Sequence, residues 1–269
     1  MRRVDCGERS DTMSHLERST GFRSRLQARE PIMGSFLKTP SSIVAEVMGL
    51  SPLGCVCIDA EHAPFGRLEL DACIAALRAA DMPTLVRVQS ATAGEILSAL
   101  DCGATGIIAP HITTAEEAHE LVRLAHYGTN GRGYAGSSRA AGYTTKSMAE
   151  HIRTSTALTT VVAQIEDAAA VDNIDAIAAV AGIDCLFIGR MDLTVSLGAA
   201  SPKDAIVLDA VNRICDAGRR HNKAIGMFFP AGESVRAWRA KGASFFLLGS
   251  DQQFMLDGAR ALAARLDSD

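Results

Sequence analysis

The stretch from Cys55 to Pro64 changes abruptly from an apolar run to acids and a histidine. Val56–Ile58 has the composition of a buried strand, and Asp59, Glu61 and His62 follow it directly. Parallel α/β sheets and barrels bind ligands at the carboxyl ends of their strands, so this cluster is a candidate site. On its own, the same stretch also fits a solvated turn with Glu61 exposed. Residues elsewhere in the chain have to decide between the two.

Polar residues also stand at the ends of other predicted strands. Arg87 ends the third strand, Gln164 and Glu166 lie at the end of the fifth, and Asp192 follows the sixth. Two carboxylates held close together repel each other unless they share a proton or a cation, and a divalent ion with oxygen ligands removes this repulsion. Glu166 and Asp192 are therefore candidate metal ligands. The alternative is a structural ion pair with Arg87 or Arg190.

Apolar runs of strand length alternate with helical patterns along the chain, and eight such units predict an α/β fold, the (β/α)8 TIM barrel. The predicted strands are 32–37, 56–58, 84–88, 105–109, 161–165, 184–188, 224–228 and 244–248. The predicted helices include 68–80, 91–100, 146–154, 168–180, 206–221, 234–240 and 252–266.

The chain is expected to form a single barrel domain over residues 22–269, preceded by a flexible tail over residues 1–21. A long connection, 127–159, contains a glycine-rich segment at 128–136, and connections of this length inside a domain are usually functional. The segment follows a helix and has no Gly-Lys-Ser/Thr ending, so we reject a nucleotide-binding loop.

Composition limits the classes of partner. A hydrophobic fraction of 48% predicts a substantial core, and a net charge of −4 gives no reason to expect nucleic acid or an anionic membrane. No run approaches the roughly 18 apolar residues of a membrane span. The seven cysteines are scattered and odd in number, which indicates reduced core residues and a cytoplasmic protein. Small molecules are the expected partners.

Six motifs occur in order along the chain: Gly34-Ser-Phe-Leu-Lys-Thr-Pro-Ser, Ile58-Asp-Ala-Glu-His-Ala-Pro, Leu85-Val-Arg-Val, Leu100-Asp-Cys-Gly-Ala, Gln164-Ile-Glu and Phe187-Ile-Gly-Arg-Met-Asp-Leu. Together they resemble the HpcH/HpaI aldolase family, the class II pyruvate aldolases typified by 4-hydroxy-2-oxoheptanedioate and 2-dehydro-3-deoxyglucarate aldolases. The resemblance covers about residues 22–265.

This resemblance implies a divalent ion bound by Glu166 and Asp192, with Mg or Mn expected before Co, Ni or Zn. It implies a function for each other site residue: His62 as the base, Arg87 as the stabiliser of the enolate oxygen, Asp101 as the residue that raises the basicity of His62, and Gln164 with the backbone amides of Met191 and Asp192 as the group that binds the pyruvate carboxylate.

General chemistry agrees with these roles. Removal of a proton from the methyl group of pyruvate creates an enolate, which a cation and a fixed guanidinium stabilise strongly. A histidine is a suitable base near pH 7, and a neighbouring carboxylate fixes its tautomer. Asp59, three residues before His62, competes with Asp101 for this orienting role, and the sequence leaves the choice open.

The predicted function is therefore an aldehyde-lyase that reversibly cleaves a 4-hydroxy-2-oxo acid to pyruvate and an aldehyde, with oxaloacetate decarboxylation as a side activity. One alternative is a lyase resembling the citrate lyase β-subunit and malyl-CoA lyase. Another is a non-catalytic barrel that binds a metal and a keto acid. A class I aldolase needs a lysine at a strand end, and only Lys38 lies near the predicted face.

Two further features bear on assembly and specificity. Relatives in the resembling family commonly have Gly-Pro where this chain has Gly189-Arg190, which leaves the range of acceptors and donors open. In that family the last helix is exchanged between subunits of a hexamer, so the resemblance implies a homo-oligomer. The apolar residues of 252–266 suit packing either on the chain's own barrel or on a neighbour's.

Overall fold

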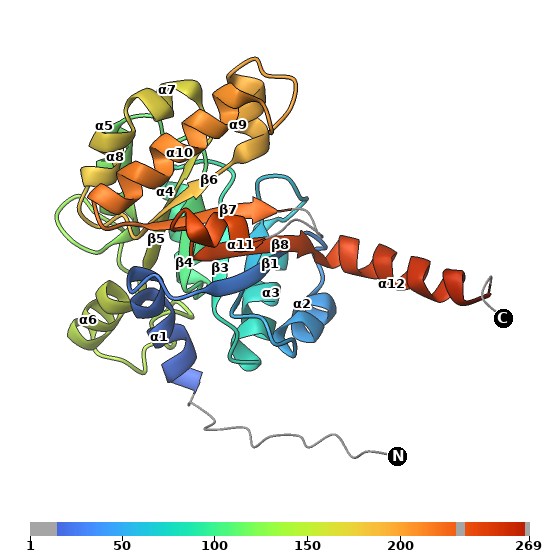
Figure 1. The fold of residues 1–269 in the computed structure, drawn as a ribbon. Helices are drawn as coiled ribbons and strands as arrows, with labels where there is room; N and C mark the ends of the chain where they lie inside the picture. The colour runs from blue at the N-terminus through green and yellow to red at the C-terminus, as the bar shows by residue number, and fades with distance from the viewer. Residues whose placement is uncertain (1–14, 230–234, 267–269) are drawn as a thin grey trace.

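The computed structural model describes residues 15–229 and 235–266. Eight parallel strands pair in sequence order and close into a barrel, β1-β2-β3-β4-β5-β6-β7-β8, with helices around it (Figure 1). The predicted TIM barrel is confirmed. All carboxyl ends of the strands consequently lie at one mouth of the barrel, as the placement of a shared site requires.

The strands are β1 (Ile32–Leu37), β2 (Cys55–Asp59), β3 (Thr84–Arg87), β4 (Gly106–Ala109), β5 (Thr160–Ile165), β6 (Cys185–Ile188), β7 (Ala224–Phe229) and β8 (Phe245–Ser250). The helices are α1 (His15–Gln27), α2 (Ser42–Gly49), α3 (Arg67–Ala79), α4 (Ala93–Asp101), α5 (Ala115–Ala125), α6 (Met148–Leu158), α7 (Ala168–Asp172), α8 (Ile174–Ala179), α9 (Arg190–Ser196), α10 (Ala205–Arg220), α11 (Val235–Ala240) and α12 (Asp251–Leu266).

The apolar core has two layers because successive strand residues point to opposite sides of the sheet. In β2, Cys55 and Cys57 belong to the cluster inside the barrel, whereas Val56 and Ile58 belong to the cluster between strands and helices. The six described cysteines are all buried and free, as predicted, and Cys6 lies outside the described residues. Burial raises the pKa of the Cys55 thiol to about 12, so it is a packing residue.

Helix α1 closes the amino-terminal end of the barrel. Phe22 and Leu26 are fully buried with the interior cluster. Asp184, just before β6, fixes the helix by accepting hydrogen bonds from Arg23 Nε at 3.0 Å and Gln27 Nε2 at 2.7 Å. The helix that carries Phe22 and Leu26 begins at His15, so residues 15–21, predicted to belong to the flexible tail, are helical. Residues 1–14 lie outside the described part.

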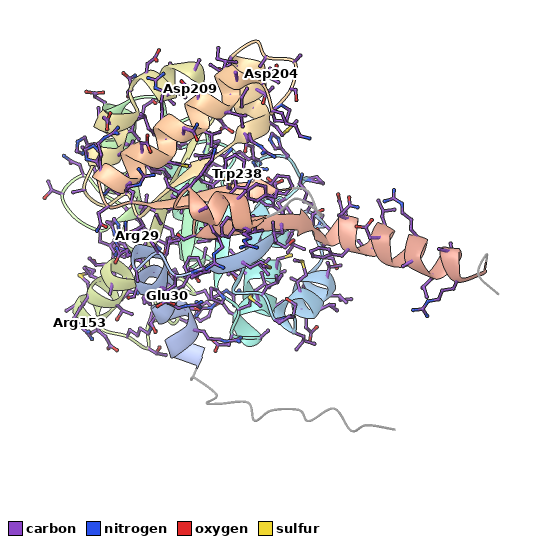
Figure 2. The ribbon with its side chains drawn as sticks, viewed as in Figure 1. Arg29, Glu30, Arg153, Asp204, Asp209 and Trp238 are labelled. Carbon is purple, nitrogen blue, oxygen red and sulfur yellow. The ribbon has the colours of Figure 1, made fainter. Side chains whose placement is uncertain are left out.

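The outer helices bury one face and expose the other. In α10, Val207, Val211 and Ile214 are buried against the barrel, while Asp209 is exposed to solvent. Asp209 on α10 and Arg153 on α6 are labelled among the outer side chains in Figure 2. This pattern explains why the sequence predicts the helices of the barrel well.

Three helical segments differ from the prediction. Helix α6 spans Met148–Leu158 instead of 146–154, since Ser147 caps its first turn by accepting from the Glu150 amide. The predicted helix 168–180 divides into α7 and α8 at Asn173. The short helix α9 after β6 is absent from the prediction, and it carries Asp192.

Helix α12 extends away from the barrel (Figure 1). Its apolar side chains Phe254, Met255, Leu256 and Leu262 are all exposed in the single chain. In this structure the helix therefore does not bury its apolar side chains on its own barrel.

Among the residues that the structure describes, no helix has both the length and the apolar character needed to cross a bilayer.

Candidate active site

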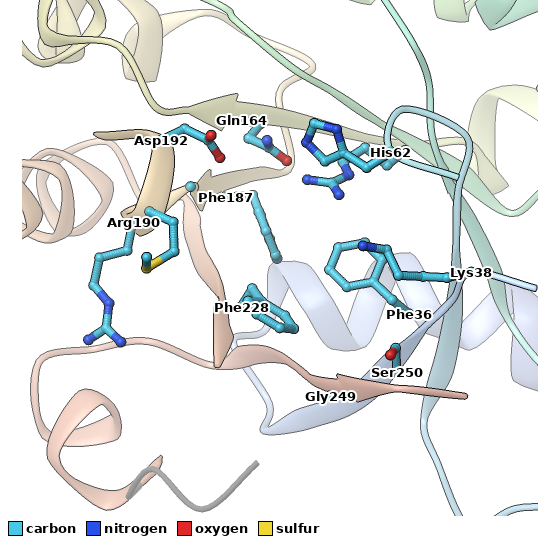
Figure 3. A pocket seen from close by; sticks show the side chains of 13 residues that line it. Phe36, Lys38, His62, Gln164, Phe187, Arg190, Asp192, Phe228, Gly249 and Ser250 are labelled. Atoms are coloured by element: carbon cyan, nitrogen blue, oxygen red, sulfur yellow. The ribbon is translucent and has the colours of Figure 1, made fainter. Parts of the chain in front are cut away.

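A pocket of about 220 Å³ opens at the mouth formed by the carboxyl ends of the strands (Figure 3). His62, Gln164 and Asp192 lie along one side of it, and the rings of Phe36, Phe187 and Phe228 form an apolar wall. The polar residues come from the ends of β2, β5 and β6. The structure thus brings together residues that are more than 100 positions apart in the chain.

Asp59 is the buried centre of an ionic network beneath the pocket. Its Oδ1 accepts from Arg87 Nε at 3.0 Å, and Lys38 Nζ lies 3.1 Å from its Oδ2. Burial alone raises the pKa of Asp59, but the hydrogen bond and charge of Arg87, the His62 amide and Lys38 outweigh it, so the pKa falls below the ordinary 3.8. Asp59 therefore stays ionised and holds two cations at the mouth.

Two consecutive backbone amides fix the loop after β1 where it carries Lys38. Asp251, the first residue of α12, is buried and accepts from the backbone amides of Lys38 at 2.7 Å and Thr39 at 3.1 Å. The Lys38 side chain also lines the pocket. The loop therefore presents a cation to any ligand bound there.

The His62 ring lies at the entrance, with 53% of the side chain exposed. Its Nε2 is 3.8 Å from Glu61 Oε2, and the same carboxylate oxygen is 3.2 Å from Arg87 Nε. Asp59 contacts the backbone of His62, accepting from its amide at 3.2 Å. Glu61, rather than Asp59, is consequently the carboxylate beside the ring.

Glu166 is buried directly after β5 and accepts two hydrogen bonds. Gln164 Nε2 donates to its Oε2 at 2.5 Å, and the His111 amide donates to its Oε1 at 3.0 Å. Burial raises the pKa of Glu166 despite these donors. A Cβ added at Gly189 would lie only 2.6 Å from Glu166 Oε2, so this glycine lets the carboxylate approach the end of β6.

His111 follows β4 in the left-handed backbone region, with φ of 55°. Its Nδ1 lies 3.0 Å from Asp167 Oδ2 and 3.5 Å from Glu166 Oε1. The hydrogen bond with Asp167 and the charges of Glu166 and Glu61 raise the pKa of His111 despite partial burial. This conformation turns both the amide and the ring of His111 toward acidic neighbours.

Two groups of residues at this mouth have the chemistry of a cation site. One atom each of Glu61, His111 and Glu166 lies within 4.8 Å of the others. The predicted metal ligands are Glu166, directly after β5, and Asp192, in the first turn of α9. Glu166 is common to both groups. Carboxylate oxygens with an imidazole suit Mn²⁺ and other divalent ions.

Asp192 and Met191 lie in the first turn of α9, where backbone amides have no acceptor within the helix. Asp192 is exposed and faces the pocket beside Gln164 (Figure 3). Arg190 extends in another direction, with its guanidinium 5.5 Å from the ring centroid of Phe229 and 5.4 Å from that of Trp238. The arginine at this position therefore stacks on aromatic rings beside the pocket.

The structure does not bring Asp101 to His62 within one chain. Asp101 ends α4, the helix that leads into the amino-terminal end of β4, whereas His62 follows the carboxyl-terminal end of β2. Its Oδ1 accepts from Arg132 Nη2 at 2.5 Å. This differs from the role that the resemblance implies, because motif order gives no information on which end of the barrel a helix terminus reaches.

Three residues at the mouth, Lys38, Glu61 and His111, have no assigned role among the predicted site residues. Each follows a predicted strand within three residues, and that position was the available signal for all three. Their importance depends on contacts between loops of different strands, which the positions alone do not give.

Comparisons with known proteins find relatives over nearly the whole barrel. A family model described as HpcH/HpaI aldolase/citrate lyase matches residues 33–257. The hydroxypyruvate/pyruvate aldolase of Paraburkholderia phytofirmans is 35% identical over 247 residues, which cover 89% of this chain and 94% of the relative. The 5-keto-4-deoxy-D-glucarate aldolase of Shigella boydii is 32% identical over 246 residues, covering 90% of this chain and 94% of the relative.

A solved structure shows the same similarity in three dimensions. The crystal structure of an HpcH/HpaI aldolase/citrate lyase family protein from Burkholderia cenocepacia has a TM-score of 0.87 at 30% identity, and the match covers 92% of this chain and 99% of the other. Since the family model and both relatives extend over nearly the whole barrel, the chain belongs to the HpcH/HpaI aldolase/citrate lyase family of enzymes.

Proposed function

We propose that this enzyme is a divalent-metal-dependent pyruvate aldolase that reversibly cleaves a 4-hydroxy-2-oxo acid to pyruvate and an aldehyde. The observation that supports it best is the convergence of His62, Arg87, Gln164 and Asp192 on one pocket, with Glu166 bonded to Gln164 beneath it. An acid–base histidine, a fixed guanidinium and two carboxylates are the groups that enolate chemistry needs.

The residues at the mouth fit a divalent ion. Glu166 is buried and accepts hydrogen bonds from the neutral amides of Gln164 and His111, and the ring of His111 is the neighbouring group that can carry a positive charge. Gln164 Oε1 is a buried acceptor without a hydrogen-bond partner. Uncompensated oxygen atoms of this kind favour a hard cation. Glu166 and Asp192 would hold it, and His111 with Glu61 would flank it. Such an ion would polarise the keto group of pyruvate as a Lewis acid.

His62 is the proposed base. Its ring is exposed at the entrance, where it can take a proton from the methyl carbon of pyruvate, and the electron pair then moves onto the keto oxygen. Glu61 beside Nε2 would stabilise the ring after it accepts the proton. Asp101 is not beside this ring in one chain, so its predicted orienting role passes to Glu61 in this proposal.

Arg87 is the proposed stabiliser of the enolate oxygen. Asp59 and Glu61 hold its guanidinium in place from below, so little reorganisation is needed when negative charge develops above it. The pyruvate carboxylate would bind at the first-turn amides of Met191 and Asp192. Gln164 donates a hydrogen bond from its side-chain amide to Glu166 in this structure, which makes Gln164 a positioning residue for the Glu166 carboxylate.

The proposal is tested by the exchange of pyruvate methyl protons in deuterated water, followed by NMR. With Mn²⁺ or Mg²⁺ present we expect exchange, and a chelator should stop it. Glu166→Gln should weaken Mn²⁺ binding, measured by electron paramagnetic resonance without any substrate. Pyruvate binding without exchange would instead favour the non-catalytic keto-acid-binding barrel.

A class I mechanism is the second candidate, because Lys38 lines the pocket. Lys38 Nζ is held 3.1 Å from Asp59 in an ion pair, which would have to break before the nitrogen could attack a carbonyl group. Borohydride reduction in the presence of pyruvate should therefore leave the mass of the protein unchanged. A reduced pyruvyl adduct on Lys38 would reverse the choice between the two mechanisms.

We further propose that the enzyme forms a homo-oligomer, a hexamer as in the resembling family, through α12. The exposed apolar side chains of this helix support an intersubunit contact. Sedimentation velocity of the full chain should give a single species larger than a monomer. The double variant Phe254→Ser, Leu262→Ser should shift it toward monomer.

A further inference from the structure

A second pocket, of about 130 Å³, lies at the opposite end of the barrel from the site. Thr105 and Thr159, which directly precede β4 and β5, are part of its wall, as are residues of α1, α4 and α6. We call it the basal pocket and define it by Arg78, Arg132, Lys146 and His151, the basic residues among those that line it.

Positive charge in the basal pocket is poorly compensated. None of the described residues that line it is an aspartate or a glutamate. Arg78 donates Nη1 to the carbonyl of Gly103 at 3.1 Å, a neutral acceptor. No carboxylate of the described residues forms an ion pair with Arg78 or with the half-buried Lys146. Cations enclosed without counter-charges are costly, because burial strengthens their mutual repulsion.

Arg132 provides an independent observation. Only 2% of its side chain is exposed, and its Nη2 pairs with Asp101. Its Nε is buried and has no hydrogen-bond partner. Most buried guanidinium N–H groups are satisfied, so this orphan donor leaves the positive charge of Arg132 only partly compensated beside the pocket. The nearby ring of His151 is consistent with this, since burial, Arg132 and Lys146 lower its pKa.

We propose that the basal pocket binds a phosphate group, held by Lys146 and Arg78 beside the positive charge of Arg132. These three cations come from α3, from the glycine-rich segment and from the loop before α6, and all three line the pocket. A tetrahedral dianion offers an oxygen to each of them, whereas a planar carboxylate has only two. Hydroxyl groups such as those of Ser155 and Thr159 can donate to the remaining oxygen.

This mode of binding differs from a nucleotide loop. A nucleotide loop wraps phosphates with glycine amides at the end of a strand, whereas here charged side chains do so at the start of two strands. The glycine-rich segment contributes by placing Arg132, and the rejection of a nucleotide-binding motif is unaffected. Bound phosphate would also link the segment and α6 to the barrel, so it should stabilise the folded state.

The test uses the full-length enzyme freed of divalent ions and titrated with inorganic phosphate by calorimetry at constant ionic strength. We expect saturable binding, which Lys146→Glu should weaken by at least about tenfold because a charge-assisted hydrogen bond is replaced by repulsion. Lys146→Arg should retain binding. Lys203→Glu, at an exposed lysine on the surface, should bind phosphate like the wild type.

Phosphate should also raise the melting temperature of the wild type and of Lys146→Arg, but not that of Lys146→Glu, compared with sodium chloride at equal ionic strength. Circular dichroism checks that each variant is folded. Equal phosphate affinity in Lys146→Glu and wild type would overturn the proposal, because the phosphate would then be bound elsewhere, for example at Arg87 and Lys38.

Two further ligands identify the source and the geometry. If glycerol 3-phosphate binds and Lys146→Glu weakens that binding as it weakens phosphate binding, the pocket takes a phosphate monoester. If inorganic phosphate binds and glycerol 3-phosphate does not, the pocket takes the free ion. Malonate competes as a planar dicarboxylate. If it bound the basal pocket more tightly than phosphate does, the preference for a tetrahedral anion would be overturned.

Discussion

The two ends of the barrel hold buried charge in opposite ways. At the carboxyl-terminal mouth five carboxylates, Asp59, Glu61, Glu166, Asp167 and Asp192, exceed the three lysine and arginine side chains, Lys38, Arg87 and Arg190, and the histidines His62 and His111 lie among them. At the amino-terminal end, Arg78, Arg132 and Lys146 gather with Asp101 as the carboxylate that pairs with one of them. The excess negative charge suits a divalent cation, and the excess positive charge suits an anion.

The difference separates chemistry from binding. Of the two ends, the mouth combines excess acid with an exposed histidine, His62, and a guanidinium that Asp59 fixes, Arg87. The basal pocket also contains a histidine, His151, but its Nε2 is engaged in a hydrogen bond of 2.9 Å with Tyr127 Oη. A base must be free to reach its substrate, so we expect reactivity at the mouth alone.

The largest effect is expected for His62→Ala. Loss of a general base should lower the rate of pyruvate methyl exchange by about 10²–10⁴-fold, while binding of Mn²⁺ is retained. The matched control is His119→Ala, an exposed histidine on α5, which should leave exchange unchanged. Exchange at the wild-type rate in His62→Ala would move the base to another residue.

Arg87→Met and Arg78→Met compare the two ends directly. Removing Arg87 leaves Asp59 buried without its main partner and should lower the free energy of unfolding by about 3–5 kcal/mol. Removing Arg78 gives up one hydrogen bond to a carbonyl but relieves repulsion from other cations, so the loss should be about 1 kcal/mol or less. Urea unfolding measures both, and equal losses would contradict the contrast.

Acid should weaken the ionic network at the mouth through Asp59. The pKa of Asp59 is lower in the folded state than its ordinary value of 3.8, so its contribution to stability is fully present above that value. The contribution is lost as the pH falls through the lower folded pKa. Unfolding free energies measured from pH 5 downward should therefore decrease in the wild type, and Asp59→Asn should show a shallower slope. Parallel curves would exclude Asp59 as the centre of the network.

The smallest effect is expected for Arg190→Ala. The guanidinium stacks on Phe229 and on Trp238 of α11, which is labelled in Figure 2. Loss of this stacking should reduce stability by about 0.5–1 kcal/mol in a thermal melt and leave methyl exchange nearly unchanged. A large fall in exchange would instead place Arg190 in the reaction.

The sequence predicts the barrel well because its signals are local. Apolar strands bounded by helical patterns recur with little ambiguity, and the strand bounds differ from the structure by only a few residues. Helix α9 was missed because it is short and its first residue follows Gly189 without a capping side chain. The division of 168–180 at Asn173 was missed because the apolar pattern continues across it.

The site was predicted less completely because its decisive features are contacts between loops. His62, Arg87, Gln164 and Asp192 do line one pocket. The carboxylate beside His62 is Glu61, whereas the two predicted candidates were Asp59 and Asp101. Neither motif order nor spacing contains the information that Asp59 faces Arg87 or that a helix terminus points to the other end of the barrel.

The plug that α1 inserts into the barrel has a kinetic consequence. With Phe22 and Leu26 sealing the far end and aromatic rings filling the interior, ligands can enter and leave only through the mouth. An aldehyde of two or more carbons bound nearer the opening would block the exit of pyruvate bound deeper in the pocket. Under the proposed function, initial-rate kinetics should thus follow an ordered sequence in which pyruvate arrives first and departs last.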